Sequence, residues 1–359
     1  MTDEIRATPF HSRTAALNRA NRWINRNGWT LAADFGDANA EALAARASVI
    51  MADITWRWRA TIEGAGAGAF LSRLLTKDAS RLKPGTASKA LWLSDSGGVM
   101  GACVIARLGR EHFILAASAP DDGWISSAAA HFGATVSDIS GESGGIAIAG
   151  PFAASALTAA GLPSAIEPLQ FREMNWRGLA VAVSRWGEHG GYEIWCKPGE
   201  GLIVWDRIAK AGARFGLVPA GLIAADILDL ERGVARPGRD YQPAQLADDA
   251  QPTPLSLGLE LLIDDGHLNF NGRAAWQTAR AAEKRRFAGI ELDCETPPSK
   301  HAALMRGDEP IGRIVASVFS PALRRAIALA QIDESSAAPE TEVRIALPTA
   351  GAAMRGRVW

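Results

Sequence analysis

Apolar positions recur along this chain in two patterns, a period of two in short runs and a helical period in longer ones. Apolar and polar side chains alternate from residue 51 to residue 62, which predicts a strand. The run 91–100 predicts a hairpin whose turn lies at Gly97 and Gly98. Further strands are expected at 103–108, 112–117 and 135–139, and helices at 14–25, 41–50, 64–75, 121–132 and 202–213.

A second hairpin is predicted between residues 179 and 195. The apolar run Leu179–Val183 predicts one strand, and the alternating run Tyr192–Trp195 predicts the next. Three glycines lie between them, and glycine alone adopts positive φ without a steric cost. The predicted tip carries an aromatic and several polar side chains: Trp186, Glu188, His189, Tyr192 and Glu193.

These side chains admit two interpretations. A flat aromatic ring and a carboxylate at one turn suit a planar ligand that presents amino and amide donors, because the indole stacks and the carboxylate accepts two N–H groups. A surface hairpin whose aromatic side chains pack on the core explains the same pattern.

The amino-acid composition limits the classes of protein to which the chain can belong. The 359 residues suffice for two or three domains, and the 48% hydrophobic and 21% charged content is that of a globular protein. A formal net charge of −1 gives no broad attraction to nucleic acid or to an anionic membrane. The three widely spaced cysteines indicate neither a metal site nor a disulfide framework, and the N-terminus has no apolar signal segment. We therefore expect a cytoplasmic protein that acts on a small molecule, binds no metal and has no membrane-spanning segment.

The hairpin at 179–195 resembles the strand–turn–strand of the aminomethyltransferase (glycine-cleavage T-protein) family. Members of that family bind tetrahydrofolate in a central cavity. The resemblance places Trp186 at the pterin-stacking position and Glu193 at the pterin-binding glutamate, with Tyr192 beside them as a cofactor-binding residue. The Gly-Gly-Tyr-Glu sequence is most similar to the branch that contains the dimethylsulfoniopropionate demethylase.

Further motifs of the same family follow in its order along the chain. They are Asp53-Ile54-Thr55, Ala149-Gly150-Pro151, the block 224–241, Phe270–Trp276 and Ile311–Pro321. The resemblance implies an α+β, multi-domain fold with mixed and antiparallel sheets around a central cavity, and a C-terminal β-barrel-like domain. It implies a folate-binding catalytic region at 1–275, made of two interleaved subdomains with an N-terminal arm at 1–36, and a barrel at 276–359.

Two departures from the family set this chain apart. The paired aspartates that follow the Gly-Gly turn are replaced by Gly101 and Ala102. The arginines of the helical block are replaced by Ala225 and Asp229. An alanine neither accepts a hydrogen bond nor carries charge, so the glycine-cleavage reaction loses its key group. The same departures weaken the case for tetrahydrofolate as the cofactor, whereas Trp186 and Glu193 support it.

Candidate acid–base groups remain in the chain. Asp240 and Tyr241 occupy a polar loop at the position that the resemblance assigns to the cavity, and a phenol there can donate a proton. His189 at the hairpin tip is a third candidate because histidine titrates near neutral pH. Each of the three residues also has a plain structural explanation, as a loop or surface side chain.

Three functions compete on these grounds. The first is a tetrahydrofolate-dependent methyl transferase that demethylates a small O- or S-methyl substrate, an aromatic or a sulfonium compound. The second is a folate-independent lyase, for instance one that releases formaldehyde from a hydroxymethyl aromatic compound, with Tyr241, Asp240 or His189 as the base. The third is a ligand-binding relative without catalysis, because fold does not fix function. A homo-oligomer is compatible with all three.

Overall fold

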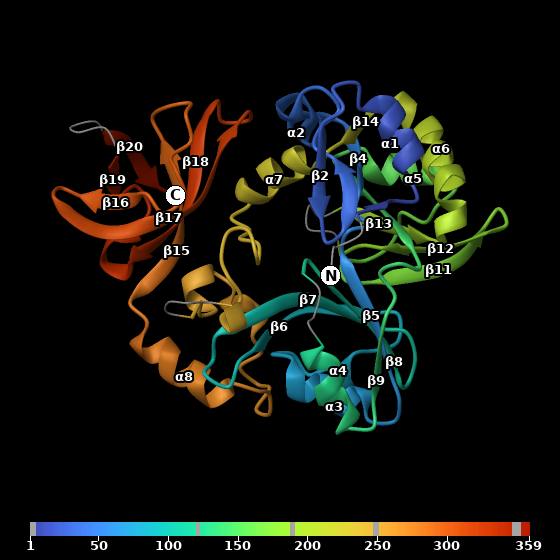
Figure 1. Ribbon diagram of the computed structural model, residues 1–359, viewed down its shortest axis with the longest axis horizontal. Helices are drawn as coiled ribbons and strands as arrows, with labels where there is room; N and C mark the ends of the chain where they lie inside the picture. Colours follow the sequence, from blue (N-terminus) through green and yellow to red (C-terminus); the bar gives the residue numbers. More distant parts are fainter. Residues whose placement is uncertain (1–4, 120–122, 187–190, 247–250, 347–352) are drawn as a thin grey trace. The chain divides into compact units, whose positions relative to one another are not determined.

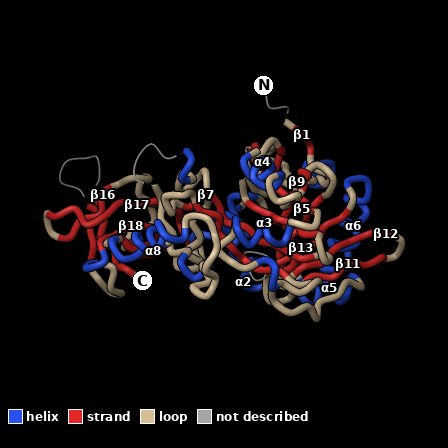
Figure 2. The backbone as a smooth tube through the Cα atoms, turned by 90° about the horizontal axis from the view of Figure 1, so that it is seen from below, coloured by secondary structure: helices blue, strands red, loops and turns tan. Residues whose placement is uncertain are grey.

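The computed structural model describes residues 5–119, 123–186, 191–246, 251–346 and 353–359 (Figures 1 and 2). The chain forms two compact units. The first unit comprises Met1–Leu71, Ala79–Lys89 and Cys103–Asp226, and the second comprises Ser72–Asp78, Ala90–Ala102 and Ile227–Trp359. Within the described ranges, no helix is long and apolar enough to cross a membrane.

A six-stranded mixed sheet forms the centre of the first unit. Its strand order is β11-β12-β13-β10-β4-β14, and only β4 and β14 run parallel. The strands are β4 (Val49–Asp53), β10 (Gly144–Ala149), β11 (Phe171–Trp176), β12 (Leu179–Ser184), β13 (Tyr192–Cys196) and β14 (Leu217–Ala220).

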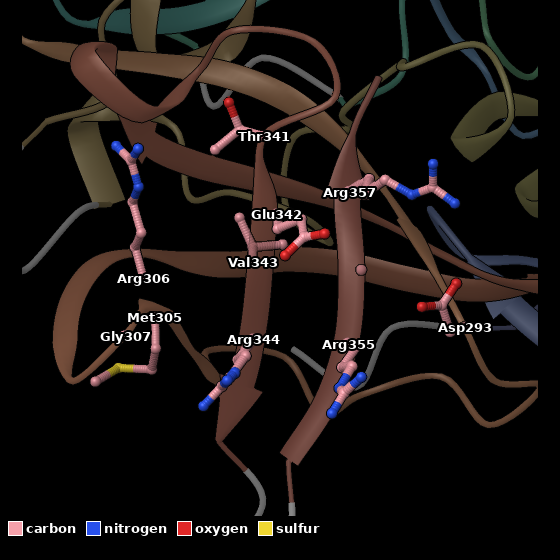
Figure 3. Close-up of a pocket in the computed structure, with 11 residues that line it drawn as sticks. Asp293, Met305, Arg306, Gly307, Thr341, Glu342, Val343, Arg344, Arg355 and Arg357 are labelled. Atoms are coloured by element: carbon pink, nitrogen blue, oxygen red, sulfur yellow. The ribbon is translucent and has the colours of Figure 1, made fainter.

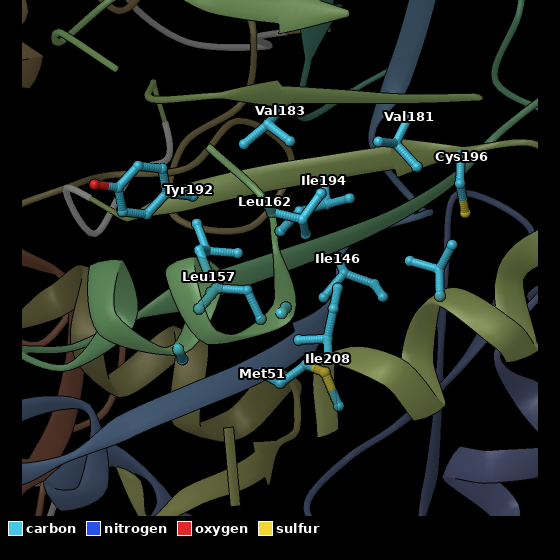
Figure 4. Packing of buried hydrophobic residues seen from close by; sticks show 14 of the residues in the cluster. Met51, Ile146, Leu157, Leu162, Val181, Val183, Tyr192, Ile194, Cys196 and Ile208 are labelled. Atoms are coloured by element: carbon cyan, nitrogen blue, oxygen red, sulfur yellow. The ribbon is translucent and has the colours of Figure 1, made fainter. Parts of the chain in front are cut away.

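One face of this sheet is apolar and packs on two helices, α5 (Ala153–Ala160) and α6 (Gly201–Gly212). Figure 4 shows the side chains that meet there, from several strands and both helices. Leu157 of α5 and Ile208 of α6 are fully buried against Ile146 and Ile194 of the sheet. Burying an aliphatic side chain of this size stabilises the fold by about 1.5–3 kcal/mol. This core fixes which side of the sheet remains for other chemistry.

Smaller elements complete the first part of the chain. A three-stranded sheet has the order β1-β3-β2, and a five-stranded sheet has the order β6-β7-β8-β5-β9. Their strands are β1 (Arg6–Ala7), β2 (Trp23–Arg26), β3 (Trp29–Ala32), β5 (Trp58–Glu63), β6 (Ala87–Leu93), β7 (Val99–Arg107), β8 (His112–Ala117) and β9 (Thr135–Asp138). The accompanying helices are α1 (His11–Leu17), α2 (Ala38–Ala47), α3 (Ala67–Leu74) and α4 (Trp124–Ala130).

A closed six-stranded barrel dominates the second unit, with the order β15-β18-β17-β16-β19-β20. Its interior is filled by alternating apolar residues of each strand. The strands are β15 (Arg285–Leu292), β16 (Ala303–Arg306), β17 (Glu309–Ser320), β18 (Arg325–Asp333), β19 (Glu342–Ala346) and β20 (Ala353–Val358). Helix α7 (Leu222–Leu230) spans the boundary between the units, and α8 (Arg273–Ala282) precedes the barrel.

Short 3₁₀ helices connect these elements. They are η1 (Ala79–Arg81), η2 (Pro198–Glu200), η3 (Ala213–Phe215), η4 (Ala244–Leu246), η5 (Leu255–Leu257), η6 (Glu260–Leu262) and η7 (Glu334–Ser336).

The predicted α+β fold, with mixed and antiparallel sheets and a C-terminal barrel, is confirmed. The hairpin β6–β7 turns at Gly97 and Gly98 as predicted, and β12 pairs with β13 antiparallel. The division of the chain at residue 275 stays a prediction.

Two predicted elements are wrong. The run 51–62 is two strands in two sheets, because the Asp53 carboxylate accepts the Thr55 N–H at 2.9 Å and starts a turn before β5. The predicted helix at 14–25 ends at Leu17, where the Asn18 side chain bonds both backbone groups of Arg22 and redirects the chain into β2.

Candidate functional site

The second face of the six-stranded sheet differs from the apolar face in Figure 4. Strand pairing places Glu193 and Trp195 of β13 on this face, because Tyr192, Ile194 and Cys196 point into the core. Their cross-strand neighbours are small: Ala147 and Ser184 beside Glu193, and Gly145 and Ala182 beside Trp195. Around β13 this face therefore presents small side chains beside Glu193 and Trp195, and Glu173 of β11 lies opposite Ala182 further along the same face.

Gly145 has a steric role on this face of the sheet. A Cβ added at Gly145 would lie 2.6 Å from the Trp195 ring, closer than any real contact. The absence of a side chain on β10 thus lets the indole lie against the backbone of the neighbouring strand.

Glu193 is held by three donors from the first unit. Its side chain pairs with Arg57, and it accepts the indole N–H groups of Trp186 at 3.1 Å and Trp195 at 3.2 Å. Only 1% of the residue is exposed. A buried carboxylate requires such partners, since an unpaired charge in this position would be strongly unfavourable.

A second arginine lies beside the same indole. The Arg59 guanidinium lies 4.0 Å from the centre of the Trp195 ring and donates to Ser143 Oγ at 2.7 Å. Burial lowers the pKa of Arg59 to about 10, against the opposing influence of Glu193 and Glu173. The site thus combines buried positive charge with aromatic faces.

Asp53 ends β4 of the same sheet. Its carboxylate accepts the Thr8 hydroxyl at 2.6 Å as well as the Thr55 N–H. Burial raises the pKa of Asp53 above its usual range, and these hydrogen bonds oppose the rise. The motif Asp53-Ile54-Thr55 therefore fixes the turn that brings Arg57 toward Glu193.

The other predicted residues of the hairpin are placed as follows. Trp186 is half-buried, meets Phe171 edge-on at 5.5 Å between ring centres, and donates to Glu193. Tyr192 points to the opposite face from Glu193, where its hydroxyl donates to the Ser164 carbonyl at 2.7 Å in the apolar core. The structure thus does not bring Tyr192 to the carboxylate that it was expected to accompany. His189 lies outside the described residues.

Asp240 and Tyr241 line a cavity of about 490 Å³ in the second unit. Its other walls are largely polar and include Lys300, His301 and Arg313. The Tyr241 ring packs in an apolar cluster with Leu91 and Trp276, and its hydroxyl has no hydrogen-bond partner among the described residues. Burial raises the pKa of Tyr241 well above its usual value, so the phenol stays protonated.

Asp240 is bound by its own loop. Its two oxygens accept Arg239 Nε at 2.7 Å and Arg239 Nη2 at 3.0 Å, and one also accepts the Arg236 backbone N–H at 2.9 Å. These bonds make Asp240 an anchor of the loop, which does not favour the role of proton acceptor that the sequence suggested for it.

The two departures from the family have structural counterparts. A Cβ at Gly101 would lie 2.1 Å from the Trp92 ring, so the indole fills the space of any side chain there. Asp229 is fully buried and pairs with Arg236 within the second unit. The sequence did not identify Trp92 or Arg57 as residues of these sites. Arg57 lies in a turn that the alternating pattern assigned to a strand, so its position near Glu193 was not predicted.

Comparisons with known proteins agree with this architecture. Residues 10–264 match the GCVT N-terminal domain, and residues 285–358 match the glycine cleavage T-protein C-terminal barrel domain. The matched barrel range coincides with the strands β15 to β20.

Full-length relatives are similar over most of their length. The chain is 30% identical to an aminomethyltransferase of Frankia alni, over 94% of this chain and 93% of that protein. It is also 30% identical to an aminomethyltransferase of Bacillus cereus, over 90% of this chain and 89% of that protein. The crystal structure of the glycine cleavage system aminomethyltransferase T from Bartonella henselae superposes with a TM-score of 0.87, at 23% identity over 99% of this chain and 96% of the other, which shows a shared fold.

Proposed function

Because the chain belongs to the glycine-cleavage T-protein (aminomethyltransferase) family of one-carbon transferases, we propose that it moves a methyl group from a small O- or S-methyl substrate to tetrahydrofolate. The single observation that carries this proposal is the buried Glu193 carboxylate on the small-residue face of the sheet.

Glu193 suits the amino and amide edge of a pterin. A carboxylate offers about four acceptor positions, and Arg57, Trp186 and Trp195 fill three of them. The remaining position is on the oxygen that Arg57 contacts, and it can accept one N–H of a planar ring. The two indole N–H groups hold one carboxylate oxygen in place, which limits how much the side chain reorders when a ligand binds.

Methyl transfer is consistent both with the residues of the family's site that this chain retains and with those that it lacks. In-line displacement at a methyl group depends chiefly on positioning, which a rigid sheet face supplies. Aromatic faces stabilise a sulfonium or a developing positive methyl group. Glycine cleavage is disfavoured, because Trp92 covers Gly101 where the family has a carboxylate.

Isothermal titration of tetrahydrofolate tests the role of Glu193. We expect Glu193→Gln to weaken binding by about 1.5–3 kcal/mol, the usual worth of a hydrogen bond to a charged group. Glu111→Gln, at an exposed carboxylate between β7 and β8, is the matched control and should leave the affinity unchanged. Equal affinities for wild type and Glu193→Gln, with an unchanged circular dichroism spectrum, would remove the pterin from this site.

A second candidate function is favoured by the unpartnered Tyr241 hydroxyl in its cavity. In a formaldehyde-releasing lyase, a base takes the proton of a substrate –CH₂OH group, the C–C bond breaks, and formaldehyde leaves. The electron pair stays on the ring carbon that carried the hydroxymethyl group, which a nearby proton donor such as Tyr241 then protonates. His189 stays a proposed base for this reaction.

Tyr241→Phe separates the two functions, since it removes the hydroxyl that would donate the proton and keeps the ring. For the lyase we expect kcat on a hydroxymethyl aromatic substrate to fall about 10²–10⁴-fold. The free energy of unfolding should stay the same or rise by about 1 kcal/mol, because a buried hydroxyl without a partner is lost. Unchanged turnover in a stably folded Phe variant would exclude Tyr241 as the donor.

A further inference from the structure

The barrel carries an arginine arrangement that the one-carbon chemistry does not use. Arg344 of β19 and Arg355 of β20 are directly opposite each other in the strand register. Val343 and Ile345 fill the barrel interior, so Arg344 faces outward, and both arginines are exposed. Figure 3 shows the two guanidinium groups projecting side by side from adjacent strands.

Like charges directly opposite on neighbouring strands destabilise a sheet. Neighbouring arginines of the barrel avoid this cost, since Arg357 pairs with Glu340 at 3.3 Å and Arg325 pairs with Glu291 at 2.7 Å. Neither Arg344 nor Arg355 has an ion-pair partner among the residues that the structure describes. The sequence of the connecting segment 347–352 contains no charged residue that could supply one.

The two arginines border a hollow of about 790 Å³, with Arg306 at the end of β16 and Gly307 of the following turn on another side; Asp293 and Glu342 also line it. A volume of this order is typical of small-molecule sites. A phosphate carries up to two charges and enough oxygens to accept paired N–H groups from two guanidinium groups at once, whereas a single carboxylate is filled by one.

We propose that the outer face of β16, β19 and β20 is a binding site for a small phosphate-bearing anion, held between Arg344 and Arg355 with Arg306 at its border. The anion supplies a negative charge for the Arg344–Arg355 pair, since Glu342, the carboxylate of the same strand register, lies opposite Arg357. This site is independent of the pterin site proposed on the first unit.

Titration of the full-length protein with pyrophosphate at low ionic strength tests the proposal. We expect saturable binding that Arg344→Gln/Arg355→Gln weakens by about tenfold or more, because each variant removes a charge-assisted contact. Arg325→Gln, on the same barrel but paired with Glu291, is the matched control and should bind like wild type. Equal affinity in the double variant overturns the proposal, as does a wild-type response that sodium chloride reproduces at matched ionic strength. Binding of citrate without binding of pyrophosphate overturns the phosphate assignment.

A charge-reversing substitution tests the same site by its effect on the melting temperature. Arg355→Glu converts the like-charged pair into a complementary pair, so the melting temperature without anion should rise, and the stabilisation by pyrophosphate should disappear. A lower melting temperature for Arg355→Glu in the absence of anion would show that the arginine pair is not strained, and would overturn the premise.

Discussion

Two regions of the molecule differ in whether they contain a buried charge: the sheet face around Glu193 and the β6–β7 hairpin. On the sheet face, a carboxylate is kept and held by an arginine and two indoles. On the hairpin, no carboxylate follows the turn, and Trp92 covers the backbone at Gly101. One region is built to present a charged group, and the other is built by packing alone.

Helix α7 extends the contrast. The arginine positions of the family are Ala225 and Asp229, and Asp229 is fully buried against Arg236. The charge in this region is therefore neutralised within the protein. This difference is what we expect if, as we propose, the chain keeps a group that recognises a flat ligand and lacks the groups of the aminomethyl reaction.

The largest expected effect is a loss of stability when the Arg57–Glu193 pair of the sheet face is broken. Arg57→Met leaves the Glu193 carboxylate buried without its cation, so the free energy of unfolding in urea should fall by about 3–5 kcal/mol. The double variant Arg57→Met/Glu193→Met is the control and should recover most of that loss, since the uncompensated charge is gone. If the single variant lost no more than the double variant, the pair would not be the organising contact of this face.

A smaller effect tests the packing of the second region. Gly101→Asp places a Cβ 2.1 Å from the Trp92 ring, and we expect a loss of about 1–3 kcal/mol from overpacking. The added carboxylate should also fail to confer aminomethyl transfer, because groups that act as a unit are not restored singly. Combining it with Trp92→Leu should lessen the loss of stability; an equal loss with either residue at position 92 would contradict the steric explanation.

The smallest effect is a pH dependence in the first region. The folded pKa of Asp53 is raised by burial, so the native state holds this proton after the unfolded chain has released it. The contribution of Asp53 to wild-type stability should therefore fall as the pH rises from near 4, the usual Asp pKa, through the raised folded pKa. Asp53→Asn lacks this titration, so its stability relative to wild type should increase over the same window.

Urea unfolding of both proteins at a series of pH values measures this difference. A difference for Asp53→Asn that falls with rising pH would mean that the hydrogen bonds from Thr8 and Thr55 outweigh burial.

Much of the fold could be predicted because its signals are local. The turn at Gly97 and Gly98 and the strands on either side of residues 187–190 follow from glycine and alternation over about ten residues. The same kind of signal failed at 51–62, because alternation continues through the turn between β4 and β5 while the strands join different sheets. Alternation reports half-buried positions and does not report the partner strand.

The sequence by itself determined the family and many of the individual strands, and it shows Gly101 and Ala102 where the resemblance expects paired aspartates. Only the tertiary structure decided what surrounds Glu193. Arg57 reaches it from 136 residues away, and the register of β10 with β13 sets Gly145 beside Trp195. Register also turns Tyr192 away from Glu193, since adjacent residues of a strand point to opposite faces. These contacts depend on how distant strands pair to bury the common core, which no short stretch of sequence specifies.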